Sequence, residues 1–394
     1  MGRALRDAGM EVIYTGLRQS PAQIVAAAAQ EDADVIGLSI LSGSHMPLVE
    51  DLMARMREAG LGAVPVIVGG IIPEDDTKAL LEQGVAAVFP PELLLAEMTA
   101  EVAKIAQAHR KRTAGSAPAE GGDWRLELSR ELSAAEQGEP ESIRSDHQAL
   151  WVGVTGSPGV GKSTFIEAFG MFLVKQGHRV AVLAVDPSSQ LSGGSILGDK
   201  TRMEELAREA NAFIRPSPAG ETLGGVARKT RETMLACEAA GYDVIIVETV
   251  GVGQSEITVA SMVDFFLLLQ LSNAGDELQG IKKGVVELAD TLVVNKADGS
   301  MKNVAERTRA DYGGALELIR SNSDAWRPRA VVVSALESEG IPEIWETILE
   351  HHELMQAGGE FDERRRKQAR AWMWKLLEDG IGRVFRELPG MREA

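Results

Sequence analysis

The 394-residue chain has a globular composition, with 44% hydrophobic and 25% charged residues, which is enough apolar material for more than one core. Its 41 Lys and Arg and 58 Asp and Glu give a formal net charge of −17. This charge argues against a protein that coats nucleic acid or lies on an anionic membrane. The single cysteine, Cys237, excludes an intramolecular disulfide and a multi-cysteine metal site. With no secretion-signal pattern and no membrane-length apolar run, we expect a cytoplasmic protein.

Residues 1–109 alternate short apolar runs with amphipathic stretches, as strands and helices in turn would. The expected strands are EVIYTG, DVIGLS, VPVIVGG and VAAVFP. Nearly continuous apolar strands joined by helices predict a parallel sheet that is covered on both faces. This is the pattern of a small flavodoxin-like domain.

Residues 110–149 are rich in Gly, Ala, Pro, Ser and charged residues, which predicts a linker. Within it, the amphipathic stretch WRLELSREL is expected to dock on a neighbouring surface.

The strand and helix alternation restarts over residues 150–352. The expected strands are LWVGVTG, RVAVLAVD, DVIIVET, DFFLLLQL, DTLVVNKAD and AVVVSAL. They predict a larger α/β domain with a doubly wound, mostly parallel sheet.

Residues 353–394 predict a helical tail, either one long amphipathic helix or a pair. Its apolar side would contain Trp372, Trp374, Leu376, Leu377, Ile381, Val384 and Phe385. This side would pack either on its own domain or on a second subunit. His351 and His352 are expected to be solvated helix caps. Residues 364–367 are expected to form a solvated helix face or, alternatively, a contact with an acidic partner.

The strongest motif lies between the strand LWVGVT and a helical stretch. It consists of Gly156, Ser157, Pro158, Gly159, Val160, Gly161, Lys162, Ser163 and Thr164, and it fits G-x-x-x-x-G-K-[ST] without mismatch. Such a loop turns backbone N–H groups toward a phosphate, and the following helix adds a favourable dipole. We expect Lys162 to reach the β and γ phosphates and the Ser163 hydroxyl to hold Mg²⁺.

Two later motifs favour GTP over ATP. Asn295, Lys296 and Asp298 form N-K-x-D after one strand, and Ser334, Ala335 and Leu336 follow the next. An Asp carboxylate can accept hydrogen bonds from guanine N1–H and the N2 amino group, whereas adenine would leave it unpaired.

Carboxylates near the ends of other strands are candidate metal and switch residues. Asp186 ends one strand, Asp199 precedes Arg202 in a Gly-rich loop, and Glu248 ends the strand before Thr249 and Gly251. Carboxylates at strand ends converge on the phosphate loop in this fold, where Mg²⁺ needs oxygen ligands. The expected metal ligands are Ser163, Asp186, Asp199, Glu248 and Thr249. Arg202 is expected to contact the nucleotide. The expected catalytic residues are Lys162 and Glu248.

Residues 150–385 resemble the methylmalonyl-CoA mutase-associated GTPases of the MeaB/ArgK type. The segments that carry the resemblance are GSPGVGKSTFIEAFG, VLAVDPSSQLSGGSILGDKTRM, AFIRPSPAGETLGGVARKTRETM, VETVGVGQSE, GDELQGIKKGVVELAD and VVNKAD. The resemblance implies a dimeric G-protein chaperone that gates cofactor loading and protects adenosylcobalamin-dependent acyl-CoA mutases. It also implies that switch and partner-coupling residues relay the nucleotide state to the mutase, namely Gly251, Gln254, Asp276, Glu277, Gln279 and Lys282.

Residues 1–109 resemble the cobalamin-binding domain of the same mutases, so that the whole is similar to the front part of fused isobutyryl-CoA mutases. Ser39, Leu41, Gly69 and Gly70 would contact the cofactor's nucleotide tail. The family's D-x-H-x-x-G, which provides the lower cobalt ligand, is expected before RALRDAGMEVIYTG and is absent, as is the central first strand. We therefore expect an unstable, rearranged or externally completed domain that binds cobalamin weakly.

The leading expectation is a GTP-hydrolysing chaperone of a cobalamin-dependent mutase. No residue stands out as a general base, so we expect slow intrinsic turnover that the partner accelerates. The alternatives are a P-loop kinase, the activity once attached to ArgK members, and a non-catalytic cobalamin carrier.

Overall fold

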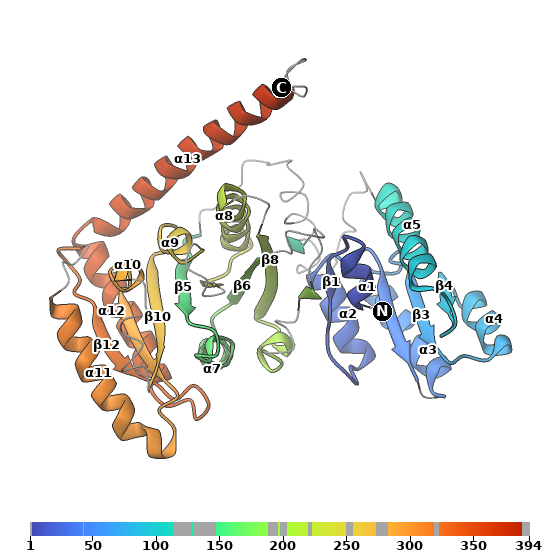
Figure 1. The fold of residues 1–394 in the computed structure, drawn as a ribbon, viewed down its shortest axis with the longest axis horizontal. Helices are drawn as coiled ribbons and strands as arrows, with labels where there is room; N and C mark the ends of the chain where they lie inside the picture. Colours follow the sequence, from blue (N-terminus) through green and yellow to red (C-terminus); the bar gives the residue numbers. More distant parts are fainter. Residues whose placement is uncertain are drawn as a thin grey trace. The chain divides into compact units, whose positions relative to one another are not determined.

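The computed structural model describes residues 2–41, 43–113, 128–129, 132, 147–187, 196–197, 203–219, 223–249, 255–272, 283–318 and 323–387. The chain divides into two compact units (Figure 1): Met1–Glu141 with Ser189–Thr201, and Ser142–Ser188 with Arg202–Ala394. Both units are α/β, as expected. No helix in the described part of the chain has the length and apolar character that a bilayer crossing requires.

The first unit is built on a parallel sheet with the strand order β2-β3-β4 in the described residues. Its elements are α1 (Gly2–Asp7), β1 (Val12–Ile13), α2 (Pro21–Gln30), β2 (Ile36–Ile40), α3 (His45–Glu58), β3 (Val66–Gly70), α4 (Glu74–Glu82), β4 (Ala87–Phe89), α5 (Leu95–Thr113) and β7 (Ile196–Leu197). The run EVIYTG contributes only β1, which lies outside this sheet and pairs in parallel with β7. The runs EVIYTG and DVIGLS, which the absent central strand would have separated, are therefore not paired with each other.

The helices of the first unit begin and pack as their sequences dictate. Ser20 caps α2, because its side chain accepts from the backbone N–H of Gln23 while the Gln23 side chain accepts from the Ser20 N–H. Helices α2 and α3 bury Val25, Ala29, Val49 and Leu52 against the sheet.

The three described residues of the predicted amphipathic stretch, Leu128, Ser129 and Leu132, pack on the first unit. Leu128 and Leu132 are buried. The Ser129 hydroxyl donates to the carbonyl of Gln30 at the end of α2, at 2.5 Å. This bond satisfies one of the carbonyls that a helix end leaves unpaired.

The second unit contains an all-parallel sheet with the order β12-β11-β10-β5-β9-β6-β8 in the described residues. Its elements are β5 (Leu150–Gly156), α7 (Lys162–Lys175), β6 (Val180–Pro187), η2 (Leu206–Arg208), β8 (Ala212–Ala219), α8 (Leu223–Ala239), β9 (Val244–Glu248), α9 (Ser255–Ala260), β10 (Phe265–Leu271), α10 (Lys283–Val286), β11 (Thr291–Asn295), η4 (Gly299–Met301), α11 (Lys302–Glu317), β12 (Arg329–Val332), α12 (Ile341–Ala357) and α13 (Glu360–Glu387). The predicted doubly wound, parallel architecture is confirmed.

Strand β8 was not predicted from the sequence. It contains Pro216 and Pro218, which cannot donate to a sheet ladder. In the structure β8 is an edge strand that pairs only with β6, and proline is tolerated at such an edge.

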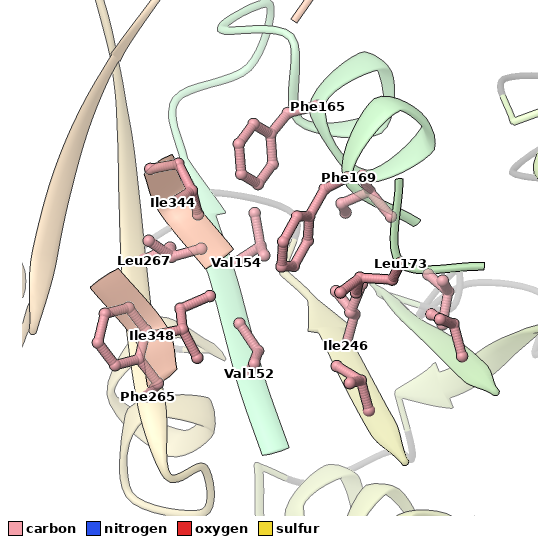
Figure 2. Close-up of a cluster of buried hydrophobic side chains, with 14 of the residues drawn as sticks. Val152, Val154, Phe165, Phe169, Leu173, Ile246, Phe265, Leu267, Ile344 and Ile348 are labelled. Carbon is pink, nitrogen blue, oxygen red and sulfur yellow. The ribbon is translucent and has the colours of Figure 1, made fainter. Parts of the chain in front are cut away.

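Helices α7 and α12 bury their apolar faces on one side of this sheet (Figure 2). Phe165, Phe169, Ile344 and Ile348 are fully or almost fully buried there against strand residues such as Val154. On the other face, a Cβ at Gly153 would lie 2.7 Å from the Phe266 ring, so that glycine permits the close approach.

The first turns of α13 are anchored by ion pairs, contrary to the expected solvated face. Arg365 donates to both carboxylate oxygens of Asp264 at 2.5 Å and to the Ala149 carbonyl at 2.9 Å, and its guanidinium lies 3.5 Å from the Trp151 ring centroid. Arg364 is half-buried and pairs with Asp290. The expectation was wrong for these two arginines, because sequence spacing does not show which acidic groups the sheet brings beneath the helix.

The tail helix packs on its own domain over part of its length and leaves other apolar side chains exposed. Trp372 packs on its own domain, with the Arg231 guanidinium 5.6 Å from its ring centroid. Farther along, Trp374 is 57% and Ile381 69% exposed, and both stand on the helix surface. The side chains of Val384 and Phe385 lie outside the described residues.

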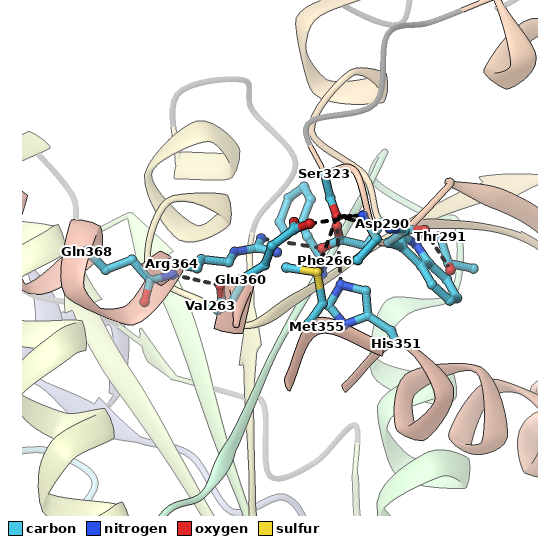
Figure 3. A network of polar contacts seen from close by, with 12 residues as sticks. Val263, Phe266, Asp290, Thr291, Ser323, His351, Met355, Glu360, Arg364 and Gln368 are labelled. Atoms are coloured by element: carbon cyan, nitrogen blue, oxygen red, sulfur yellow. Dashed lines mark hydrogen bonds and ion pairs between the residues drawn. The ribbon is translucent and has the colours of Figure 1, made fainter. Parts of the chain in front are cut away.

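His351 is not the solvated cap that the sequence suggested. Helix α12 continues to Ala357, and His351 packs edge-on against the Phe265 and Trp326 rings at 4.8 and 5.1 Å. Its Nε2 lies 3.9 Å from Asp290 Oδ1, within the polar network that Figure 3 shows. Burial lowers the pKa of His351 to about 4, although the nearby Asp290 carboxylate opposes this shift. His352 contacts the Phe361 ring, and burial lowers its pKa as well.

The buried His351 should make the fold sensitive to acid. Its folded pKa lies below the ordinary value of 6.5, so the unfolded chain takes up the proton first as the pH falls. The free energy of unfolding should therefore decrease as the pH falls from 6.5 to about 4. With His351→Leu, the loss of unfolding free energy between about pH 7 and about pH 5, measured with urea, should be smaller by about 2 kcal/mol. Equal losses in both proteins would contradict the assignment.

Candidate nucleotide-binding site

The parallel sheet of the second unit places four motif-bearing strand ends at one edge. Strand β5 leads into the phosphate loop, β9 ends at Glu248, β11 ends at Asn295, and β12 is followed by Ser334. All these strands are parallel, so their carboxyl ends meet at the same edge of the sheet.

The phosphate loop has the backbone geometry that its glycines permit. Gly156 (φ +151°) lies against β10, where a Cβ would come 2.5 Å from the Leu269 carbonyl oxygen. Gly159 and Gly161 also have left-handed φ values, +81° and +93°, which side-chain-bearing residues rarely adopt. Helix α7 then begins at Lys162, so that its N-terminus faces the loop. Ser157 and Val160 close the turn with a backbone hydrogen bond, whereas Pro158 and Thr164 are exposed.

The polar side chains at the start of α7 point to phosphate and metal chemistry. The Lys162 ammonium is buried and donates to the carbonyls of Gly156, at 2.7 Å, and Ser157, at 3.2 Å. The Ser163 hydroxyl donates to Glu248 Oε1 at 3.3 Å. A hydroxyl beside a carboxylate is the type of oxygen donor pair that Mg²⁺ prefers. These two residues therefore fit the metal that the sequence implies.

Asn295 joins the N-K-x-D loop to the phosphate loop. Its Nδ2 donates to the Val160 carbonyl at 3.0 Å, and its Oδ1 accepts from the Ala335 N–H at 3.2 Å. Lys296 adds a second link, since its Nζ donates to the Gly159 carbonyl at 2.7 Å. The Asn295 side chain thus connects its own N-K-x-D motif with the phosphate loop and with the motif after β12, although the three lie far apart in the sequence.

The two candidate guanine motifs also contact each other. The Ser334 hydroxyl donates to Asp298 Oδ1 in a short hydrogen bond, and it accepts from the Glu337 N–H at 3.1 Å. Ser334 and Ala335 are buried, whereas the Leu336 side chain is 75% exposed. The carboxylate of Asp298 is therefore held in place by the loop that follows β12.

Several predicted residues cannot be placed. Arg202, Asp199, Gly251, Gln254, Asp276, Glu277, Gln279 and Lys282 lie outside the described residues, as does the side chain of Asp186. Among the described residues, no group of three His, Cys, Asp or Glu side chains could hold a metal ion. Asp186 and Asp199 thus stay predictions.

The sequence reasoning missed three hydroxyls that support this edge. Thr155 accepts a hydrogen bond from the Thr249 hydroxyl at 2.7 Å, behind the phosphate loop. Thr308 and Ser272 lie behind Asn295–Asp298. Thr155 and Ser272 stand at or just after the ends of predicted strands, which is the signal that could have identified them. Thr308 lies in the middle of α11 and carries no such signal.

In the first unit, the predicted cobalamin contacts are brought together in part. Ser39 and Gly69 are register partners on β2 and β3. Gly70 follows with φ +153°, and a Cβ there would clash with the Ile40 carbonyl. Leu41 is 82% exposed beyond β2. His45, the first residue of α3, is buried and lies 2.8 Å from Asp76 Oδ2.

Comparison with known proteins agrees with both units. The family model for Methylmalonyl Co-A mutase-associated GTPase MeaB matches residues 140–388, and the model for the B12 binding domain matches residues 1–94. The first of these covers well over half of the chain. The chain belongs to the MeaB family. It is therefore a GTPase of that family, and a B12-binding-type domain precedes its GTPase domain.

Curated relatives and a solved structure support the assignment. The chain is 52% identical to the mouse "Methylmalonic aciduria type A homolog, mitochondrial" over 68% of this chain and 63% of that protein, which is less than two thirds of its length. It is 51% identical to a probable GTPase of Mycobacterium tuberculosis, over 71% of this chain and 87% of the relative. A crystal structure described as an LAO/AO transport system kinase is 40% identical, with a TM-score of 0.55, and the match covers 66% of this chain and 82% of that one.

Proposed function

We propose that this MeaB-family chain binds GTP and Mg²⁺ at the carboxyl edge of the second sheet, and gates cofactor loading of an adenosylcobalamin-dependent acyl-CoA mutase. The observation that supports guanine-nucleotide binding is the contact between the two candidate guanine motifs. Ser334 holds the Asp298 carboxylate, while Asn295 ties the same loop to the phosphate loop.

The fixed Asp298 carboxylate explains a preference for guanine. It would accept hydrogen bonds from N1–H and the N2 amino group of the base, and the backbone after Ser334 would meet O6. Adenine offers neither donor and would leave a partly buried carboxylate without a partner. We therefore assign base selection to Asn295–Asp298 and Ser334–Leu336.

Lys162, Ser163 and Glu248 would carry the chemistry at the phosphates. The Lys162 ammonium, now bonded to loop carbonyls, would turn to the β and γ phosphate oxygens and stabilise their charge. Ser163 and Glu248 would hold Mg²⁺, which supplies further positive charge at the phosphates when bound. A water oxygen would attack the γ phosphorus, and the bond from that phosphorus to the β–γ bridging oxygen would break. GDP would leave with the electron pair, and the water oxygen would stay in inorganic phosphate, whose formation releases the water proton.

Replacing the base-reading carboxylate should change the base preference. In Asp298→Asn, an amide N–H would face the C2 position, where it suits the carbonyl of xanthine better than the amino group of guanine. GTP affinity should fall by roughly a hundredfold and XTP affinity should rise. Competition binding with both nucleotides measures this change.

Asp311→Asn is the matched control, because Asp311 is an exposed carboxylate on α11 of the same unit. It should bind GTP as the unchanged protein does. An Asp298→Asn protein that retains the original preference for GTP over XTP would show that Asp298 does not read the base.

The tail helix supports a homodimer. Met373, Trp374, Leu377 and Ile381 recur along one face of α13 and are 46–69% exposed. An exposed apolar stripe of this kind favours a protein partner. We assign it to a second copy of the chain, which leaves the nucleotide edge available to the mutase.

The chaperone role predicts that the partner controls turnover. GTP hydrolysis should be slow for the chain alone and rise at least about tenfold when methylmalonyl-CoA mutase is added, because no described residue is placed as a general base. Light scattering on the same samples should give twice the chain mass without the mutase. Fast hydrolysis that the mutase leaves unchanged would contradict the chaperone role, and a single-chain mass would contradict the dimer.

The first unit supports a cobalamin contact at the carboxyl edge of β2 and β3. Ser39 and Gly69 are register partners near the ends of these strands, and Leu41 presents an exposed apolar side chain beyond β2. His45 is committed to Asp76 and is not placed to ligate cobalt. We therefore assign weak binding without a protein imidazole ligand.

A visible-absorption titration with adenosylcobalamin tests this assignment. The spectrum should stay close to that of the free cofactor, with saturation only at high protein concentration. Tight binding with the spectral change of histidine ligation to cobalt would contradict it.

A further inference from the structure

Two buried hydroxyls, those of Thr308 and Ser272, lead to the N-K-x-D loop and are not among the groups expected to touch the nucleotide. Thr308 on α11 is 8% exposed, and its Oγ1 donates to the Ser272 carbonyl at 2.8 Å. Ser272 follows β10 and is 3% exposed. Its own hydroxyl donates to the Lys296 carbonyl at 3.4 Å. A chain of two hydrogen bonds thus runs from α11 to the base-reading loop.

This chain ends at a strained residue. Lys296 has φ +60°, a left-handed conformation that costs free energy for a residue with a side chain. Such a conformation persists only where the surrounding structure holds it. Here the Lys296 carbonyl accepts from Ser272, its ammonium donates to Gly159, and the next N–H, of Ala297, donates to the Val333 carbonyl at 3.3 Å.

The strained peptide determines where the base-reading groups lie. Asp298 is two residues beyond Lys296, and η4 begins directly after it. A rotation of the Lys296 peptide would therefore move the Asp298 carboxylate relative to Ser334. The Ser272 hydroxyl holds this loop at the Lys296 carbonyl, whereas the phosphate loop accepts from the Lys296 ammonium and the Asn295 amide.

We propose that Thr308 and Ser272 are positioning residues for guanine recognition. They fix the Lys296 peptide in its left-handed conformation, and so align Asp298 with both hydrogen-bond donors of the base. This inference rests on the proposed guanine site.

The test replaces one hydroxyl by a methyl group of the same size. Thr308→Val leaves the Ser272 carbonyl unpaired in a buried place, so the Kd for GDP should rise about tenfold. The Kd for IDP, whose base lacks the N2 amino group, should rise only about twofold to threefold, because IDP has one fewer donor to lose. The Kd for IDP divided by the Kd for GDP measures base discrimination. This ratio should therefore fall in Thr308→Val.

Two further variants make the result specific. Thr308→Ser keeps the hydroxyl and should restore both the affinity and the ratio. Thr347→Val is the matched control, because Thr347 is also 8% exposed and its Oγ1 donates to a backbone carbonyl, that of Glu343, at 2.7 Å. Thr347→Val should bind both nucleotides as the unchanged protein does.

Three outcomes would overturn the proposal. One is a Thr308→Val protein whose GDP affinity stays within about twofold of the original. Another is a loss of affinity with an unchanged GDP-to-IDP ratio, and the third is an equal loss in Thr347→Val. If Thr308→Val does not fold, Ser272→Ala takes its place. The fall in the IDP-to-GDP ratio of Kd values should be smaller there, because the Ser272 hydroxyl makes the longer of the two hydrogen bonds. An unchanged ratio in Ser272→Ala would also overturn the proposal.

The Asp298→Asn variant separates this inference from the proposed function. If Asp298→Asn leaves base preference unchanged, the guanine site itself is wrong. If Asp298→Asn alters the preference and Thr308→Val does not, only the positioning role is wrong.

Discussion

The side chain of Asn295 is the contact on which the nucleotide edge depends. It bonds to the Val160 carbonyl in the phosphate loop and to the Ala335 N–H in the loop after β12. It can do so only because β5, β10, β11 and β12 run parallel and end together. A Cβ at Gly161 would lie 2.9 Å from the Asn295 amide nitrogen, so that the third glycine of the motif is needed for this approach. The proposed phosphate site and the proposed base site therefore share one hydrogen-bonded arrangement.

The opposite edge of the sheet fixes the same strands by ionic contacts. The Trp151 N–H near the start of β5 donates to Asp264, which Arg365 of the tail helix also holds. The Phe266 N–H donates to Asp290, with which Arg364 pairs. The tail helix therefore belongs to the core of the second unit over its first turns, and only its later turns are available to a partner.

Much of this fold follows from the sequence alone. The apolar runs that predict strands depend on local composition, as do the phosphate loop and N-K-x-D. These elements lie where the pattern puts them, except that the run EVIYTG contributes only β1, outside the first sheet. Strand β8 was missed because prolines conceal an edge strand. His351, Arg364 and Arg365 were misread because their burial depends on which distant residues pack against them. Thr308 could not be identified for the same reason: its partner, Ser272, is 36 residues away.

The two units combine a GTPase domain and a B12-binding-type domain in one chain. The family assignment gives the GTPase, and the B12-binding match gives the kind of domain that precedes it. The proposed nucleotide site of the second unit requires a preference for guanine over adenine. Displacement of labelled GDP from the unmodified protein by GTP and by ATP tests this most directly. GTP should displace the label at concentrations near that of the sites, and ATP should fail even at roughly a thousandfold excess. Equal displacement by the two nucleotides would contradict the account.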